Sequence, residues 1–380
     1  MLAIGLMSGT SADGVDAALV ELDTEGDRVS FSLLGFLSEP YPDAVREAII
    51  AVARPGGGTV DEICQLNVLV GHYFGQAARA VCDRAGKDLS NVRVIGSHGQ
   101  TIHHLPEETD VHGRAVRSTL QIGDAATIAE STGIRVVSDF RSRDIAVGGQ
   151  GAPLVPLVDY LLCRSDDVGR VMLNLGGISN LTGLAPGCAR QDVFAFDTGP
   201  GNMIIDALVA QATDQSYDRD GALAAKGTVD PQVVDALLED SYFLRSPPKS
   251  TGREFFGHTF LQKLHALTKE HPFEDRVATA TSLTARSVGE SVDRFVRPEF
   301  APDEVYVSGG GRNNPVLMQW LQDALPDCDL QPTDMLGVDS NAKEALAFAI
   351  LAVETLEGRP GNLPRVTGGS RSVVLGQITP

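Results

Sequence analysis

The sequence predicts an α/β protein built from two similar halves, and three observations carry this prediction. Apolar strand-like runs come first and helix-like runs lie between and after them, which favours mixed sheets with α/β crossovers. A strand–turn–strand pattern at residues 3–22 returns in weaker form at residues 171–184, as a duplicated fold would leave it. A chain of 380 residues with 43% hydrophobic residues is large enough for two domains with substantial cores.

The individual elements follow from local patterns. The predicted strands are short apolar runs that end in glycine, serine or charged residues, and they lie at residues 2–7, 15–22, 29–37, 92–95, 135–138, 171–175 and 305–308. The predicted helices carry apolar residues at helical spacing, and they lie at residues 43–53, 60–84, 125–131, 202–212, 232–238, 280–295, 315–324 and 342–356.

The composition restricts the partners and the compartment. A net charge of −19 argues against nucleic acid or an anionic membrane as a partner, because their phosphates repel such a surface. The five cysteines are odd in number and lack CxxC spacing, which fits reduced thiols in a cytosol. No targeting segment or bilayer-length apolar stretch is visible in the sequence, so we expect a cytoplasmic protein.

The first chemistry-bearing segment is the turn between the first two predicted strands. It contains small residues that let backbone N–H groups approach an anion, namely Gly9, Thr10, Ser11 and Gly14. Asp13 and Asp16 add carboxylates, which are ligands for a hard cation. The pattern favours a nucleotide site; an ordinary Gly/Asp hairpin turn is the alternative.

Two later glycine-rich turns have a similar character. Asp197 precedes Gly199, Gly201 and Asn202, where a strand ends and a helix begins, and a helix N-terminus favours anions. A carboxylate at that place suggests a base or a metal ligand, although a turn-capping Asp is the plainer interpretation. Near the C-terminal end, a strand leads into Gly309, Gly310, Gly311 and Asn313, which could take the adenosine side of a nucleotide or be a structural turn. P-loop and dinucleotide fingerprints are missing.

A third group of residues resembles a surface for a small polar substrate. Gln100 and Thr101 follow the predicted strand 92–95 and are neutral hydrogen-bonding groups suited to sugar hydroxyls. Arg141 and Asp144 lie in a charged run that could grip a substrate carboxylate or form a solvated cluster. Glu344, at the start of the last long helix, could cap that helix or hold a metal-bound water.

The three histidines near Gln100 raise a competing possibility. His98, His103 and His104 could form a zinc site, but they do not fall at i, i+4 on one helical face.

Nine motifs in order along the chain together resemble one family, anhydro-N-acetylmuramic acid kinase. They lie at residues 7–16, 97–101, 121–124, 139–141, 148–156, 174–177, 196–202, 248–253 and 308–311. The resemblance implies an actin/hexokinase-like fold with two duplicated ribonuclease H-like lobes and an interlobe active-site cleft. We place the first lobe at residues 1–136 plus 345–380 and the second at residues 137–344.

The resemblance also implies a reaction. ATP with Mg²⁺ would phosphorylate O6 of 1,6-anhydro-N-acetylmuramic acid while water opens the anhydro ring, giving N-acetylmuramic acid 6-phosphate for cell-wall recycling. Asp197 would be the general base. Gly9 to Asp16 and Gly199 to Asn202 would bind phosphates, and Gly309 to Asn313 the adenosine side.

The same resemblance assigns the remaining candidates. Gln100, Thr101, Arg141 and Asp144 would hold the sugar, and Asp13 and Glu344 would hold Mg²⁺ through waters. Residues 105–120 are longer than the family pattern, and we expect a surface loop there.

Three alternatives stay open at this stage. One is a kinase for an anhydro-sugar without a lactyl group, such as levoglucosan. Another is a nucleotide-switched binding protein of the same fold without enzyme activity. A metal hydrolase that needs no ATP is the third. The expected partner is a small sugar, and a homodimer is compatible with the sequence.

Overall fold

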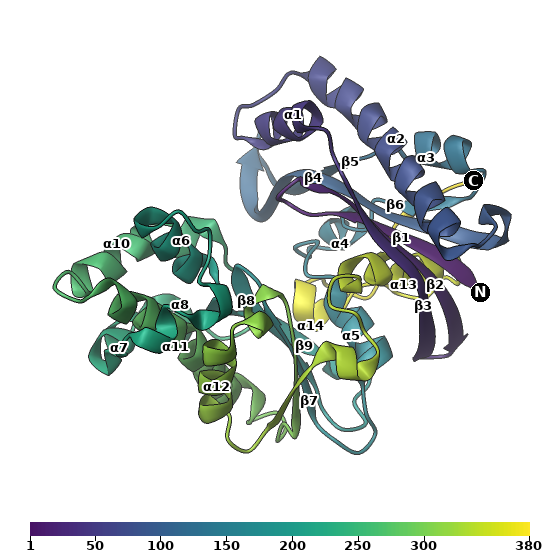
Figure 1. Cartoon of the computed structure of the whole chain (residues 1–380). Helices are drawn as coiled ribbons and strands as arrows, with labels where there is room; N and C mark the ends of the chain where they lie inside the picture. The colour runs from purple at the N-terminus through teal and green to yellow at the C-terminus, as the bar shows by residue number, and fades with distance from the viewer. The chain divides into compact units, whose positions relative to one another are not determined.

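A computed structural model describes residues 1–380, which divide into two compact units. The first unit contains residues 1–162 and 341–380, and the second contains residues 163–340. Each unit has its own β-sheet covered by helices (Figure 1). None of the helices is both long enough and apolar enough to cross a lipid bilayer.

The sheet of the first unit has the strand order β12-β6-β4-β1-β2-β3, with β5 added to β4. The β1–β2 and β2–β3 pairs are antiparallel, whereas β1–β4 and β4–β6 are parallel. The strands are β1 (Leu2–Ser8), β2 (Gly14–Glu25), β3 (Arg28–Pro40), β4 (Val92–Val111), β5 (Arg114–Ile122), β6 (Val136–Ser138) and β12 (Gln377–Thr379).

The second unit repeats this arrangement. Its sheet has the order β11-β10-β7-β8-β9, with antiparallel β7–β8 and β8–β9 pairs and parallel β7–β10 and β10–β11 pairs. Five strands in each unit therefore share one order and one pattern of directions, which confirms the predicted duplication of a ribonuclease H-like lobe. The strands are β7 (Arg170–Leu175), β8 (Ile178–Leu184), β9 (Phe194–Pro200), β10 (Glu304–Ser308) and β11 (Asp329–Pro332).

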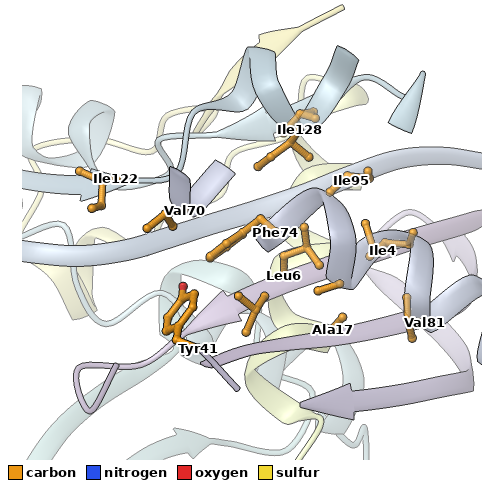
Figure 2. Close-up of a cluster of buried hydrophobic side chains, with 14 of the residues drawn as sticks. Ile4, Leu6, Ala17, Tyr41, Val70, Phe74, Val81, Ile95, Ile122 and Ile128 are labelled. Atoms are coloured by element: carbon orange, nitrogen blue, oxygen red, sulfur yellow. The ribbon is translucent and has the colours of Figure 1, made fainter. Parts of the chain in front are cut away.

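Two long helices of the first unit form its core with the sheet. Figure 2 shows Phe74 of α2 among Leu6, Ile4 and Ile95 of the sheet, and all four side chains are fully buried. Helix α13 lies close to β1, because a Cβ built on Gly5 would stand 1.7 Å from the backbone oxygen of Ala345. The helices are α1 (Asp43–Ala53), α2 (Val60–Ala85), α3 (Ala125–Thr132), α4 (Ser142–Ala146), α5 (Val155–Cys163), α13 (Lys343–Leu356) and α14 (Pro364–Thr367).

The second unit contains two buried apolar clusters. One joins its sheet to α11 and α12, and the other joins α11 to the helices between residues 203 and 267. Helix α11 ends in a π-helical turn, η5 (Val292–Val296). The helices are α6 (Met203–Ala212), α7 (Pro231–Leu238), α8 (Ser241–Leu244), α9 (Arg253–Phe256), α10 (His258–Leu267), α11 (Phe273–Ser291) and α12 (Pro315–Ala324).

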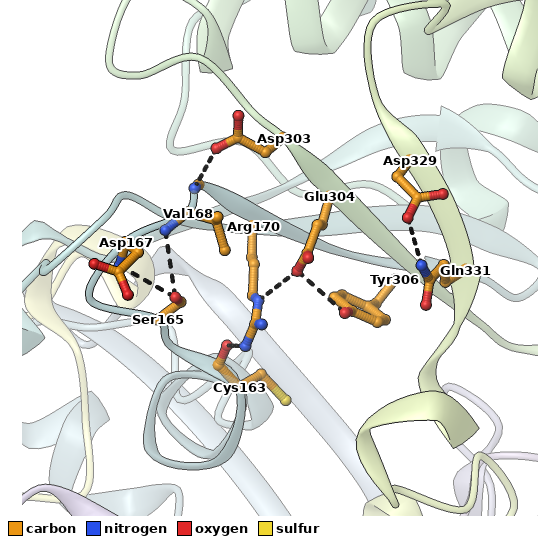
Figure 3. Close-up of polar contacts among 11 residues, drawn as sticks. Cys163, Ser165, Asp167, Val168, Arg170, Asp303, Glu304, Tyr306, Asp329 and Gln331 are labelled. Atoms are coloured by element: carbon orange, nitrogen blue, oxygen red, sulfur yellow. Dashed lines mark hydrogen bonds and ion pairs between the residues drawn. The ribbon is translucent and has the colours of Figure 1, made fainter.

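The two ends of the second sheet differ in chemistry. At the start of its parallel strands, Arg170 on β7 donates to Glu304 on β10 at 2.7 Å and to the Cys163 carbonyl at 2.8 Å (Figure 3). Tyr306 also donates to Glu304, at 3.1 Å. These contacts close one end of the sheet with side chains, whereas glycine-rich turns follow β7, β9 and β10 at the other end.

Three expectations differ from the structure. The boundary expected after residue 136 lies after residue 162, because β6 pairs with β4 and Asp144 bonds to Asn362 in the first unit. The first unit resumes at residue 341 rather than 345. Residues 105–120 are not a loop, since they form most of the β4–β5 hairpin. Helix α11 begins at Phe273, well before the predicted residue 280.

Candidate active site

The first predicted phosphate turn is fastened by a buried amide. The Gln100 side chain donates to the Gly9 carbonyl at 3.0 Å, and its oxygen lies 2.6 Å from the Ser8 hydroxyl. That hydroxyl also lies 2.7 Å from the Gly14 carbonyl across the turn. Gln100 is 1% exposed, so the structure uses the amide to shape the turn rather than leaving it open to a sugar. Thr10 and Ser11 at the tip are exposed.

The acidic residues of this region have different environments. Asp13 is exposed and pairs with Arg46 at 3.1 Å. Asp16 accepts a hydrogen bond from Ser38, and burial raises the pKa of its carboxyl group. Desolvation by the surrounding protein also raises the pKa of the Glu344 carboxyl group, and the charge of Asp16 adds to the effect. The Glu344 side chain is nevertheless partly exposed to solvent. The Asp16 charge therefore disfavours ionisation of Glu344, whereas Asp13 is paired with Arg46.

Arg141 is held by a histidine that the sequence analysis considered only for zinc. Its Nε and Nη2 atoms lie 3.1 and 2.9 Å from His98 Nε2, and Nη1 donates to the Gly151 carbonyl at 2.7 Å. His98 Nδ1 lies 2.8 Å from the Gly99 carbonyl, so it carries the proton and Nε2 is the acceptor. Burial, followed by the Arg141 charge, lowers the His98 pKa to about 3, so the ring stays neutral. The three nearby histidines belong to no cluster able to hold a metal ion.

Asp144 is a structural crosslink in this conformation. It is fully buried and accepts from Gly151 N at 2.8 Å, Asn362 Nδ2 at 2.7 Å and the Thr367 hydroxyl at 2.7 Å. A sugar could contact this carboxylate only if the surrounding loop moved. Thr101 is half-buried, and its hydroxyl accepts from Gln121 at 3.2 Å.

The second unit brings its glycine-rich segments together. The turn Gly176–Gly177 after β7 accepts backbone hydrogen bonds from Gly201, Asn202 and Met203, at 2.8 to 3.1 Å. The Asn202 side chain bonds to the Leu175 carbonyl at 3.0 Å, and a Cβ built on Gly311 would stand 3.0 Å from its oxygen. From the sequence, the turn at 176–177 is a sign of duplication and part of one family motif, but it is assigned no role in the site.

Close approach or a positive φ requires glycine at three of these turn positions. Gly309 has a φ of +83°, and a Cβ there would stand 2.7 Å from Asn174 Oδ1. A Cβ on Gly201 would stand 2.2 Å from the Gly176 oxygen. Gly199 has a φ of +149°, while Gly310 has open space beside Asn202. Asn313 is exposed at the end of the short 3₁₀ turn η6 (Gly310–Asn313).

Asp197 lies on β9, and its carboxylate can accept more hydrogen bonds than it does. Thr251 N donates to Asp197 Oδ2 at 2.8 Å, and this is its one hydrogen bond. Burial raises the Asp197 pKa to about 6; the Thr251 bond opposes this, Glu254 adds to it, and Lys249 opposes it. A carboxyl group with a pKa near the working pH and an open oxygen can take a proton from a neutral nucleophile.

Comparisons with known proteins identify the family of the chain. The family described as Anhydro-N-acetylmuramic acid kinase matches residues 1–380. A protein named anhydro-N-acetylmuramic acid kinase from Caldanaerobacter subterraneus subsp. tengcongensis is 46% identical, with 100% of this chain and 96% of the relative covered. One from Salinibacter ruber is 46% identical, covering 99% and 95%.

A solved structure was also compared with the chain. A ROK family glucokinase from Streptomyces griseus, in complex with glucose and AMPPNP, aligns over 93% of this chain and 100% of its own. The TM-score is 0.39 and the sequence identity is 13%, so the assignment depends on the sequence matches. The family match spans residues 1–380, and the two relatives cover 99–100% of the chain. The chain therefore belongs to the anhydro-N-acetylmuramic acid kinase family, whose members are ATP-dependent kinases of peptidoglycan recycling.

Proposed function

We propose that this chain opens the 1,6-anhydro ring of anhydro-N-acetylmuramic acid with water and transfers the γ-phosphoryl group of ATP to O6. The observation that carries the proposal is Asp197, a half-buried carboxyl group with a pKa of about 6 and one hydrogen bond. Such a group is mostly ionised at neutral pH and still basic enough to accept a proton, which suits a general base.

The proposed reaction couples hydrolysis of the C1–O6 bond to phosphoryl transfer onto O6. Asp197 accepts a proton from water as the water oxygen bonds to C1 of the sugar. The C1–O6 bond breaks, and O6 bonds to the γ-phosphorus while the bond from phosphorus to the β–γ bridging oxygen breaks. ADP and N-acetylmuramic acid 6-phosphate leave, and the proton on Asp197 passes to solvent. General-base assistance of this kind contributes about 10²–10⁴-fold to the rate.

We propose that the glycine-rich turns of both units bind the nucleotide. Small or absent side chains at these turns let phosphate oxygens approach the backbone closely. Gly9, Thr10, Ser11 and Gly14 would serve the phosphates from the first unit. Gly199, Gly201 and Asn202 would line the phosphates from the second, where the Gly201 and Asn202 N–H groups donate to the Gly177 and Gly176 carbonyls in this structure. Gly309 to Asn313 would lie on the adenosine side.

We propose Mg²⁺ as the cation and Glu344 as one of its holders, through water. The donor set fits, because the Asp16 charge disfavours ionisation of Glu344 and a divalent cation would relieve that repulsion. When bound, Mg²⁺ neutralises charge on the phosphates during transfer. Asp13 was the other predicted holder; its pairing with Arg46 makes it the weaker candidate.

For the sugar we propose Arg141 and Thr101 as contacts. Arg141 has five N–H donors, of which three serve His98 and Gly151, so two are left for the lactyl carboxylate. The geometry favours supporting roles for Gln100 and Asp144. A cytoplasmic location, a homodimer and the lack of nucleic-acid or membrane partners stay predictions from the sequence.

An isotope experiment tests the reaction. The enzyme is incubated with anhydro-N-acetylmuramic acid, ATP and ¹⁸O-water, and the product is analysed by mass spectrometry. We expect one ¹⁸O at C1 and none in the phosphate ester. Label in the phosphate, or product formed without ATP, would contradict the proposed sequence of bonds.

A parallel assay with levoglucosan tests the substrate. We expect a lower kcat/KM, since that sugar lacks the carboxylate for Arg141. A higher value would make levoglucosan the better candidate substrate.

A further inference from the structure

Lys249 is a buried cation that the reaction scheme above does not use. It is 4% exposed, and its ammonium nitrogen lies among three aromatic rings. The distances from Nζ to the ring centroids are 4.8 Å for Phe295, 5.0 Å for Tyr242 and 5.7 Å for Phe196. We call these three rings the aromatic cage. They come from the π-helical turn η5, from α8 and from β9, so the cage joins three elements.

The cage holds the ammonium group without a carboxylate partner at ion-pair distance. The polar contacts of Nζ are the carbonyl oxygens of Tyr242 and Phe243, each at 3.4 Å. Arg294 and Arg245 face it with like charge, and Asp197 with opposite charge. Burial, then Arg294 and Arg245, lower the Lys249 pKa to about 8. A buried lysine in such surroundings costs stability, whereas an apolar side chain of similar size would not.

The backbone around Lys249 is bonded directly to Asp197. Asp197 N donates to the Lys249 carbonyl at 3.1 Å, and Thr251 N, two residues on, donates to the Asp197 carboxylate at 2.8 Å. Tyr242, a wall of the cage, donates through its hydroxyl to the Asp197 carbonyl at 2.8 Å. The segment that carries Lys249 therefore fixes both the backbone and the side chain of Asp197.

We propose that Lys249 is a positioning residue for the kinase reaction: its ammonium group, seated in the aromatic cage, fixes residues 249–251 against Asp197 and keeps that carboxylate ionised. The inference rests on the proposed role of Asp197 as general base. Cation–π attraction favours a charged side chain in the cage, and the same charge favours the ionised form of the Asp197 carboxylate. The other charged or titratable groups facing Asp197 are Glu254 and Tyr242.

The test separates charge from packing. Lys249→Met keeps the length of the side chain and fits an aromatic-lined space, so we expect it to fold. The pH dependence of kcat/KM is measured with anhydro-N-acetylmuramic acid and ATP. Without the cation, we expect the acid limb to move up by about 0.5–1 pH unit. We also expect kcat at neutral pH to fall several-fold. Lys249→Arg should restore the wild-type limb, and Lys249→Gln repeats the loss of charge if Lys249→Met is insoluble.

The control is another lysine of the same unit. Lys263 on α10 is about two-fifths exposed and lies 3.5 Å from Asp240, so Lys263→Met should leave the pH profile unchanged. A wild-type acid limb in the neutral Lys249 variants would show that the residue only packs, and would overturn the inference. Asp197→Asn distinguishes the two proposals: if it stays active, the general base is wrong, whereas if it is inactive and the Lys249 profiles are normal, only this inference fails.

Discussion

Asp144 in the first unit and Asp197 in the second differ in how many hydrogen bonds their carboxylates accept. Asp144 accepts three hydrogen bonds, from Gly151, Asn362 and Thr367, and is fully buried. Asp197 accepts one, from Thr251, and its pKa is raised to about 6 mainly by burial. A carboxylate whose lone pairs are occupied stabilises the fold, whereas one with a free oxygen and a raised pKa is available for chemistry. Residue type alone does not separate these two states.

The largest effect should come from Asp197→Asn. An amide keeps the size of the side chain but cannot accept the proton from water, so we expect kcat to fall by about 10²–10⁴-fold. ATP binding, measured by calorimetry, should stay within a few-fold of wild type, because the variant changes no glycine-rich turn. Turnover close to wild type would remove Asp197 from its proposed role and with it the contrast to Asp144.

Asp144→Asn should act on stability instead. In the variant, an NH₂ group replaces a carboxylate oxygen that accepts hydrogen bonds, so two donors would face each other. A buried donor left unsatisfied costs about 1–3 kcal/mol. We expect a lower urea midpoint in equilibrium unfolding. Thr367→Val, which removes one of the three donors, is the matched control and should lower the midpoint less. An unchanged midpoint for Asp144→Asn would mean that the three bonds contribute little.

The contrast also explains what the sequence could predict. The glycine turns after β1, β9 and β10 depend on neighbouring residues, so local patterns located them and the strands around them. Two of the three partners of Asp144 lie 218 and 223 residues away, and the Gly9 carbonyl lies 91 residues from Gln100. No local pattern could therefore reveal how fully both side chains are occupied. The β4–β5 hairpin was missed because its outer half is rich in charged residues typical of loops.

His98 offers a smaller effect that appears only in acid. Its folded-state pKa is about 3, lowered by burial and by Arg141, against 6.5 unperturbed. Below pH 6.5 the unfolded chain therefore binds a proton that the folded chain excludes, and stability is lost as the pH falls toward 3. At pH 5 the loss from this residue is about 2 kcal/mol.

Replacing His98 by glutamine tests this origin. The amide can accept from Arg141 and donate to the Gly99 carbonyl as the neutral ring does, without a titrating group. Unfolding of both proteins in urea at pH 7 and pH 5 should show a smaller acid loss in His98→Gln. An equal loss in the two proteins would assign the acid sensitivity to other groups.

The smallest effect should come from the acids of the first unit, to which the same criterion applies. Glu344 has no ion pair and lies near the charge of Asp16, while Asp13 is already neutralised by Arg46. If the carboxylate without an ion pair is the one that holds the cation, Glu344→Gln should raise the Mg²⁺ concentration for half-maximal activity by about 10-fold. Asp13→Asn should raise it less, because the lost charge was largely compensated by Arg46. Titrating activity with Mg²⁺ at saturating ATP measures both, and a larger effect for Asp13→Asn would show that an exposed ion pair does not prevent a carboxylate from holding the cation.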